Sequence, residues 1–265
     1  MKRSPEQSGF RIIGLKEAGS TNSCLKQLCR EREVEEFTVL TVENQTAGRG
    51  QRGNCWESEP GKNLTFSLLV RPVFLEAREQ FLISQIISLS IKEELDRFGE
   101  GFTVKWPNDI YWNDLKICGI LIENNLSGTV ISESIIGACV NLNQHCFSSP
   151  APNPVSLAGI TGREHSRGEF LNNILVRFAD YYRELRDGNR RQITAAYDRS
   201  LYRRCGFHAY EDSNGRFRAA ITGVNPDGVL VLRDTEGVSR RYAFKEVAFV
   251  SDFSGTEKEI PGNVQ

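Results

Sequence analysis

The sequence has few histidines and no cysteine pattern typical of a metal site. Its 265 residues include three histidines and seven cysteines, and no C-x-x-C motif occurs. Scattered ligands of this kind do not complete the four-coordinate shell that structural zinc prefers. The odd number of cysteines and their irregular spacing also argue against a disulfide framework. We therefore predict reduced, mostly structural thiols and no metal site built from protein side chains alone.

Long apolar runs and an excess of charge of one sign are also missing. No apolar run approaches the ~18 residues of a membrane-spanning helix, and the first residues lack the apolar core of a signal peptide. With 33 basic and 34 acidic residues the net charge is -1, which gives no general attraction to nucleic acid or to an anionic membrane. The composition predicts a cytoplasmic protein with neither kind of partner.

Hydrophobic periodicity predicts an α+β region followed by a smaller β region. Strands are expected at 10–15, 37–42, 63–70, 102–106, 109–112, 116–123 and 129–141, and helices after residue 22 and at 76–98, 169–185 and 192–201. The long helix reads as amphipathic, and 144–157 reads as a loop. Strands at 217–224, 229–233 and 241–250, separated by turn signals, indicate a small β-barrel. We predict a main domain at 1–205, the barrel at 206–253 and a disordered tail at 254–265.

A glycine-rich segment lies between two of the expected strands. It runs from Asn44 to Trp56 and reads N-Q-T-A-G-R-G-Q-R-G-N-C-W. Glycine permits positive φ and a close approach of backbone to a ligand, and arginine offers a planar fork of donors to phosphate or carboxylate. Taken alone, the segment fits two interpretations equally well: a cover over an anion, or a solvated hairpin loop that carries two arginines by chance.

Two other polar motifs surround this segment in the sequence. Ser20, Thr21 and Asn22 precede an expected helix, and capping explains one of them but not all three. Further along, K-W-P-N-D ends at Asp109 and is followed by K-x-x-G-I-L-x-E, which begins at Lys116. A lone lysine on a strand is usually solvated, whereas one that faces a cationic loop across a cleft suggests an anion site.

Together these motifs resemble those of the biotin protein ligase family. The family has a glycine loop close to G-R-G-R-x-G-R-x-W and a second signature, K-W-P-N-D, followed by a catalytic lysine in K-x-x-G-I-L-x-E. The resemblance covers roughly residues 11–250 and includes the triplet at 20–22, Gln45 and the strand end G-A-C-V-N at 137–141. It implies a mixed β-sheet with helices packed on it, as in class II synthetases, and a C-terminal barrel like that of Src-homology-3 domains.

The resemblance also implies roles for individual residues. Biotin would be bound by Ser20, Thr21, Asn22, Gln45, Arg49, Gly50, Gln51, Lys116 and Gly119, and the nucleotide by Arg49, Arg52, Trp56, Asn108, Lys116 and Asn141. Lys116, Arg49 and Arg52 would stabilise charge on the reacting phosphate. Asp109 is a candidate base for the acceptor lysine, and a turn-capping aspartate is an equally good interpretation. Mg²⁺ would arrive with the ATP phosphates.

The implied activity is ATP-dependent biotinylation of a lysine on the biotin carrier domain of a carboxylase, through biotinyl-5'-AMP and with release of pyrophosphate. Three alternatives differ in what they require. A lipoate or octanoate transfer enzyme of the same superfamily fits the glycine loop and K-W-P-N-D less well, and an inactive biotin-binding module would not need Lys116. A DNA-binding regulator needs a further domain, and about ten residues precede the first expected strand. The resemblance is compatible with a monomer and with a homodimer.

Three positions depart from the family pattern. Gln51 and Asn54 stand where arginine is common, so the loop carries less positive charge. Since an ionic hydrogen bond is worth ~1.5–3 kcal/mol against ~0.5–1.5 for a neutral one, we expect weaker retention of the adenylate. Cys139 replaces a common glycine. It either packs or narrows the nucleotide side of the site, and we favour packing.

Overall fold

A computed structural model describes residues 9–51, 55–148 and 153–251 of the chain. The chain forms two compact units. One comprises Met1–Tyr202 with Pro226–Gly228, and the other comprises Arg203–Asn225 with Val229–Gln265. Each unit has its own β-sheet, and each is described by itself below.

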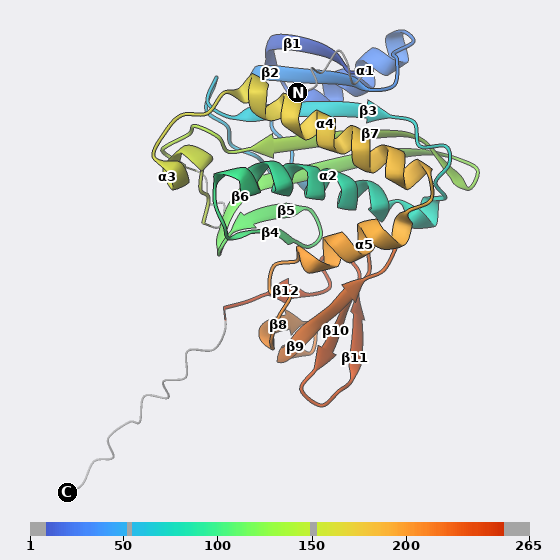
Figure 1. The fold of residues 1–265 in the computed structure, drawn as a ribbon, viewed down its shortest axis with the longest axis vertical. Helices are drawn as coiled ribbons and strands as arrows, with labels where there is room; N and C mark the ends of the chain where they lie inside the picture. Colours follow the sequence, from blue (N-terminus) through green and yellow to red (C-terminus); the bar gives the residue numbers. More distant parts are fainter. Residues whose placement is uncertain (1–8, 52–54, 149–152, 252–265) are drawn as a thin grey trace, which may run out of the picture. The chain divides into compact units, whose positions relative to one another are not determined.

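The first unit is built on a seven-stranded mixed sheet (Figure 1). In sequence its strands are β1 (Arg11–Ala18), β2 (Thr38–Gln45), β3 (Leu64–Val70), β4 (Phe102–Lys105), β5 (Asp109–Trp112), β6 (Leu115–Ser127) and β7 (Val130–Val140). Across the sheet their order is β1-β2-β3-β7-β6-β5-β4. Only β1 and β2 run parallel, and every other pair of neighbours is antiparallel. This arrangement confirms the predicted α+β fold with a mixed sheet.

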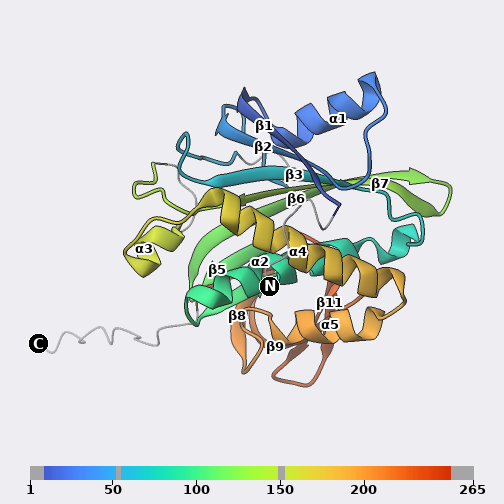
Figure 2. The ribbon, with the colours of Figure 1, turned by 45° about the horizontal axis from the view of Figure 1, so that its top comes forward.

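Helices cover both faces of this sheet. The connection from β1 to β2 is α1 (Thr21–Glu31), which packs on β2, β3 and β7. The opposite face carries α2 (Phe81–Leu95), and α4 (Arg167–Arg186) and α5 (Arg190–Arg199) pack on α2 in turn. Figure 2 shows α1 above the strands and α2 and α4 below them.

Strand β3 shows how the sequence divides the two faces. All seven of its residues are buried, and its side chains alternate between the two sides of the sheet. Thr65 and Ser67 lie on the α1 side, where Ser67 bonds to Thr21 and Asn22. Phe66 therefore faces the other side, toward the helical layer. The α1 side of this strand is therefore polar at Thr65 and Ser67 and apolar at Leu69, which packs with Leu25 of α1, whereas the other side is apolar core.

Several predicted boundaries differ from the structure. The predicted helix 76–98 is a 3₁₀ turn at Ala77–Glu79, the helix α2, and a second 3₁₀ turn at Asp96–Phe98. The prediction of an amphipathic helix is wrong here, because α4 and α5 cover the side of α2 that a two-layer fold would leave in water. A short helix, α3 (Leu157–Thr161), begins at the end of the predicted loop, and its Ser156 cap accepts a hydrogen bond from the Gly159 amide.

The second unit is a five-stranded antiparallel sheet in the order β11-β10-β9-β8-β12. Its strands are β8 (His208–Asp212), β9 (Gly215–Val224), β10 (Leu230–Asp234), β11 (Ser239–Tyr242) and β12 (Ala248–Phe249). Strand β8 was missed from the sequence, and the predicted strand 241–250 is two short strands joined by a turn. The architecture is consistent with the expected Src-homology-3-like barrel. Its core includes Tyr210, Ile221 and Leu232.

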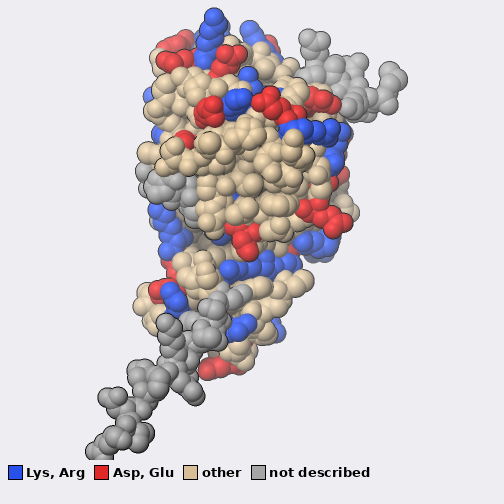
Figure 3. Space-filling model, turned by 90° about the vertical axis from the view of Figure 1, so that its left-hand side faces the viewer, with Lys and Arg blue, Asp and Glu red and all other residues tan. Residues whose placement is uncertain are grey.

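The mixed charge on the surface and the reduced state of the cysteines match what the composition predicts. Figure 3 shows acidic and basic side chains interspersed around a broad uncharged area on one face of the molecule. All seven cysteines are free thiols. Within the described residues, no helix has both the length and the apolar character needed to cross a membrane.

Candidate functional site

The candidate site lies on the α1 side of the first sheet, where strands β2, β3, β7 and β6 lie next to one another. The register pairs Thr65 with Cys139 and Ser67 with Gly137 across β3 and β7. It then pairs Cys139 with Gly119 across β7 and β6. Directly paired residues point to the same face, so this face carries small and polar side chains next to the N-terminus of α1.

The first turn of α1 gives this face several hydrogen-bonding groups. Ser20 is the N-cap residue, but its hydroxyl makes no capping hydrogen bond within the described part of the chain. The backbone amide of Thr21 instead donates to Gln45 Oε1 at 3.0 Å. A distant glutamine thus satisfies one of the backbone amides that have no partner within the helix. The buried Ser20 hydroxyl is not required for capping.

Asn22 is fixed by contacts on three strands. Its Oδ1 accepts from Ser67 Oγ at 2.6 Å, and its Nδ2 donates to the Leu121 carbonyl at 3.2 Å and to Glu123 Oε2 at 2.9 Å. A Cβ at Gly137 would lie 2.3 Å from Asn22 Oδ1. Glycine is required there, because the asparagine is bonded on both sides and cannot move away.

The glycine-rich segment folds back on itself above the same face. The Trp56 amide donates to the Gly48 carbonyl at 3.0 Å, and Arg49 and Cys55 form an isolated antiparallel bridge. A Cβ at Gly119 would lie 2.6 Å from the Trp56 ring. The indole therefore lies against β6, on a position that only glycine leaves open.

Two ion pairs place cations beside this face. Lys116 Nζ lies 2.8 Å from Asp109 Oδ1 and 5.3 Å from the centre of the Trp56 ring. Arg49 Nη2 lies 3.0 Å from Glu123 Oε2. Both cations come from the motifs singled out in the sequence. The face therefore offers positive charge at two points, and each charge is held in place by a carboxylate.

Three buried polar atoms near this face have no hydrogen-bond partner among the described residues: Gln51 Oε1, Trp56 Nε1 and Asn141 Oδ1. Buried polar atoms in native proteins are nearly always satisfied, so unpaired ones mark places where a ligand or water completes the bonding. Two of the three lie on the glycine-rich segment, and Asn141 follows β7. They fit a polar ligand that lies between the loop and the end of β7.

Comparisons with known proteins agree with this geometry. Residues 16–141 match the Biotin/lipoate A/B protein ligase family. The chain is 26% identical to a biotin protein ligase from Aquifex aeolicus solved in complex with biotin and ATP, with a TM-score of 0.75 over 90% of this chain and 97% of that one. Over residues 16–141 this chain is therefore similar to the Biotin/lipoate A/B protein ligase family.

Curated relatives within this family are similar over much of their length. A biotin–[acetyl-CoA-carboxylase] ligase from Paracoccus denitrificans is 29% identical over 207 residues, which are 75% of this chain and 85% of that one. The bifunctional ligase/repressor BirA of Bacillus subtilis is 27% identical over 242 residues, 90% of this chain and 74% of that protein. The resemblance found in the motifs therefore extends over most of the chain.

The structure brings together most of the residues that the family motifs predicted. Ser20, Thr21, Asn22, Gln45, Arg49, Trp56, Asp109, Lys116 and Gly119 all belong to the contacts described above. Asn108 is less available, because its Nδ2 donates to the Ile120 carbonyl at 2.7 Å. Arg52 lies outside the described residues, as do Gly53 and Asn54.

Sequence reasoning missed two residues of the site, Ser67 and Glu123. Ser67 could have been found, because Thr65 and Ser67 put polar groups at alternate positions of an otherwise apolar strand. Glu123 stood at the end of a recognised motif, but its partner Asn22 is 101 residues away. That contact depends on the order of the strands, which the motif does not state.

Cys139 is partly buried on the same face, 3.8 Å from Gln45 Nε2. Burial raises the pKa of its thiol to about 11. A thiol with this pKa is protonated at neutral pH and is a poor nucleophile. Its contacts favour the packing role, in which Cys139 lines the floor of the site beside Gln45.

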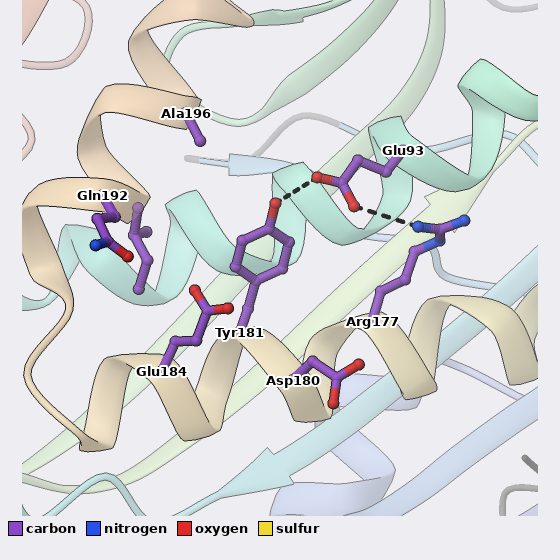
Figure 4. A pocket seen from close by; sticks show the side chains of 8 residues that line it. Glu93, Arg177, Asp180, Tyr181, Glu184, Gln192 and Ala196 are labelled. Carbon is purple, nitrogen blue, oxygen red and sulfur yellow. Dashed lines mark hydrogen bonds and ion pairs between the residues drawn. The ribbon is translucent and has the colours of Figure 1, made fainter.

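Two surface hollows lie away from this face. One, of about 350 Å³, is formed by α2, α4 and α5 and is drawn in Figure 4. Within it the Tyr181 hydroxyl donates to Glu93, and Arg177 Nη1 lies 3.3 Å from the same carboxylate. The other, of about 290 Å³, includes Glu94 and His165. In these hollows, polar side chains from neighbouring segments bond to one another and so stabilise the packing of the helices.

Proposed function

We propose that this protein attaches biotin to a lysine of an acceptor protein in two ATP-dependent steps, as a ligase. One observation carries the proposal: the first turn of α1, the glycine-rich loop and Lys116 converge on one face of the sheet. The chain is similar in sequence and fold to a ligase solved with biotin and ATP. That convergence supplies polar groups for a ring at one end and cations for a phosphate at the other.

The biotin ring would lie at the first turn of α1. Its ureido group has one carbonyl and two N–H groups, so it needs both donors and acceptors. The Ser20 and Thr21 hydroxyls and the Asn22 and Gln45 amides provide both kinds. Gly137 makes room for the Asn22 side chain itself, and Cys139 lines the floor beside Gln45. We assign recognition of the ring to these groups.

In the first step a carboxylate oxygen of biotin bonds to the α-phosphorus of ATP, and the bond from that phosphorus to pyrophosphate breaks. Two anions must approach each other, so fixed positive groups lower the barrier most. We assign this role to Lys116 and Arg49, and Arg52 joins it as a prediction from the family motif. Gly50 and Gln51 would close over the carboxylate.

The nucleotide would lie between Trp56 and the end of β7. The indole offers a surface for stacking, and Asn141 Oδ1 is a buried acceptor without a partner among the described residues. Asn108 and Asn141 each donate Nδ2 to a backbone carbonyl. The unpaired Oδ1 makes Asn141 the better supported nucleotide ligand of the two.

Magnesium enters this proposal with the ATP. Among the described residues, no group of three or more His, Cys, Asp or Glu side chains is placed to hold a metal ion. We therefore assign Mg²⁺ to the ATP phosphates and water, which it commonly prefers over an all-protein cage.

In the second step the acceptor amine attacks the biotinyl carbonyl, and AMP leaves. Making a free lysine neutral at pH 7 costs ~4–5 kcal/mol, so a base near the site would help. Asp109 is the candidate, although one of its oxygens already pairs with Lys116. If Asp109 is the base, Asp109→Asn slows transfer from preformed biotinyl-AMP by at least about tenfold. Unchanged transfer, measured apart from pyrophosphate release, assigns Asp109 to holding Lys116 alone.

The acceptor in this proposal is the biotin carrier domain of a carboxylase, as the name of the Paracoccus relative indicates for that protein. The cytoplasmic location expected from the sequence belongs to the same proposal. Sedimentation of the purified protein with and without biotin decides between the monomer and the homodimer that the family resemblance allows.

Release of pyrophosphate from Mg·ATP tests the proposal directly. Purified protein is expected to release pyrophosphate with biotin and not with lipoate, and to label a purified carrier domain when one is added. Release with lipoate alone assigns the chain to the lipoate branch of the family. If neither acid causes pyrophosphate release and calorimetry still detects biotin binding, the protein is a binding module.

A further inference from the structure

Glu123 connects two parts of the site, α1 and the glycine-rich loop, but has no role in the mechanism above. Its Oε2 accepts from Asn22 Nδ2 at 2.9 Å and from Arg49 Nη2 at 3.0 Å. Its Oε1 lies 3.8 Å from Lys26 Nζ. Its side chain is 26% exposed, so these contacts are only partly screened by solvent. One carboxylate on β6 thus holds both the first turn of α1 and the glycine-rich loop.

The contact with Asn22 decides which atom of that amide is available to a ligand. Both Nδ2 hydrogens are used, one by the Leu121 carbonyl and one by Glu123. Only Oδ1, which accepts once from Ser67, retains hydrogen-bonding capacity. Asn22 therefore presents an acceptor, which suits a ring N–H. Without the carboxylate, one of the two donors that fix this orientation would lose its partner.

The contact with Arg49 restricts the cation of the glycine-rich loop. The Arg49 side chain is 45% exposed, and its ion pair with Glu123 uses one terminal nitrogen, Nη2. A long side chain on a glycine-rich backbone samples many rotamers, and ordering it on binding costs free energy. A carboxylate fixed on a sheet strand reduces that cost in advance. Lys26 offsets part of the carboxylate charge, which limits its repulsion of an anionic ligand.

We propose that Glu123 is a positioning residue: it orients the Asn22 amide toward the ring of biotin and the Arg49 guanidinium toward the carboxylate and phosphate. The inference rests on the proposed biotin adenylation. It places no bond between Glu123 and the ligand. The effect of Glu123 passes through two other residues, and each can be tested separately.

Two substitutions separate these two contacts. Glu123→Gln keeps an oxygen that can accept from Asn22 but removes the charge that holds Arg49. Glu123→Ala removes both. In biotin-dependent pyrophosphate release we expect KM for biotin to rise about threefold in Glu123→Gln and about thirtyfold in Glu123→Ala. We expect a smaller fall in kcat in both variants, because Arg49 acts on the reacting phosphate as well as on bound biotin.

Repeating the comparison in an Arg49→Ala background shows whether Arg49 transmits the effect. Glu123→Gln is then expected to cause no further rise in KM, whereas Glu123→Ala still raises KM about tenfold through Asn22. Glu133→Gln is the matched control. Glu133 accepts from Asn125 Nδ2 at 3.1 Å and lies 3.7 Å from Arg71 Nη2, on the neighbouring strand.

The inference is overturned if adding Glu123→Gln to Arg49→Ala raises KM by the same factor as in the unsubstituted protein. It is also overturned if Glu123→Gln and Glu133→Gln have equal effects on KM. So does a fall in kcat with unchanged KM. Circular dichroism and thermal unfolding identify a variant that fails to fold, and the Glu123→Gln arm decides the question if Glu123→Ala does fail. Absence of pyrophosphate release by the unsubstituted protein contradicts the proposed function instead, so the two failures are distinguishable.

Discussion

The two ends of the site are built differently. At the first turn of α1, Asn22, Gln45 and Ser67 bond to one another or to the sheet, and most of their hydrogen-bonding groups have protein partners. In the loop, Gln51 and Trp56 each have a buried polar atom without a partner among the described residues. The first end has its geometry before a ligand binds. The second has contacts that a ligand would complete.

This difference indicates how substitutions at the two ends should behave. A change among mutually bonded side chains disturbs several partners at once, so it should affect stability as well as binding. A change in the loop affects a group that acts mainly on the ligand. Charge in the loop should therefore alter rates and retention with little effect on the fold.

The largest effect is expected at the loop end, for Lys116→Ala. Removing one charge-stabilising donor costs ~10²–10³ in rate, and we expect at least that loss in pyrophosphate release. Biotin affinity, measured by calorimetry, should change by less than about tenfold. Lys62→Ala removes a surface lysine paired with Glu164 and serves as a control. A loss of similar size in affinity and in rate would contradict the separation of the two ends.

Alanine at two glycines compares the ends directly. At Gly137 the added Cβ meets Asn22 Oδ1 at 2.3 Å, and at Gly119 it meets the Trp56 ring at 2.6 Å. Overpacking against a fixed group costs ~1–3 kcal/mol, so we expect Gly137→Ala to weaken biotin binding about tenfold or more and to lower the melting temperature. Trp56 lies on a loop and can move, so Gly119→Ala should leave the melting temperature nearly unchanged. Equal losses of stability would show that the loop is as rigid as the pocket.

A smaller effect is expected for Gln51→Arg, which restores the charge common in the family. An ionic hydrogen bond exceeds a neutral one by ~1 kcal/mol. We therefore expect biotinyl-AMP to dissociate about fivefold more slowly from the variant. Gln51→Ala provides a neutral comparison. Equal dissociation rates from the unsubstituted protein and from the Gln51→Arg variant would show that this position does not retain the adenylate.

The smallest effect concerns the floor of the pocket. Burial raises the pKa of Cys139 to about 11, so the reactive thiolate forms only as the pH approaches that value. Alkylation of Cys139 by iodoacetamide, followed by mass spectrometry, should be slow at pH 8 and rise through pH 10. The exposed Cys55, Cys146 and Cys205 should react faster at pH 8. Biotin should protect Cys139, and a rate independent of biotin would place the thiol outside the pocket.

Local patterns in the sequence predicted the strands and the motifs, and the structure brings those motifs together. What they could not predict depends on the third dimension. The helix α2 carries a periodic apolar stripe, yet it is buried nearly all round because α4 and α5 form another layer. The contact of Glu123 with Asn22 requires β7 to lie between β3 and β6. Hydrophobic periodicity reports which residues are buried, but not what covers them.

The strand order also has a consequence for folding. Strands β4, β5, β6 and β7 are neighbours in sequence and pair as successive hairpins, whereas β3 pairs with β7 across an insertion that contains α2 and three strands. Local pairings form before distant ones because they cost less loop-closure entropy. We expect the hairpins to form early and the β3–β7 pairing late. Asn22 and Glu123 would meet only in that late step, so the ability to bind ligand should be among the last properties that the chain acquires.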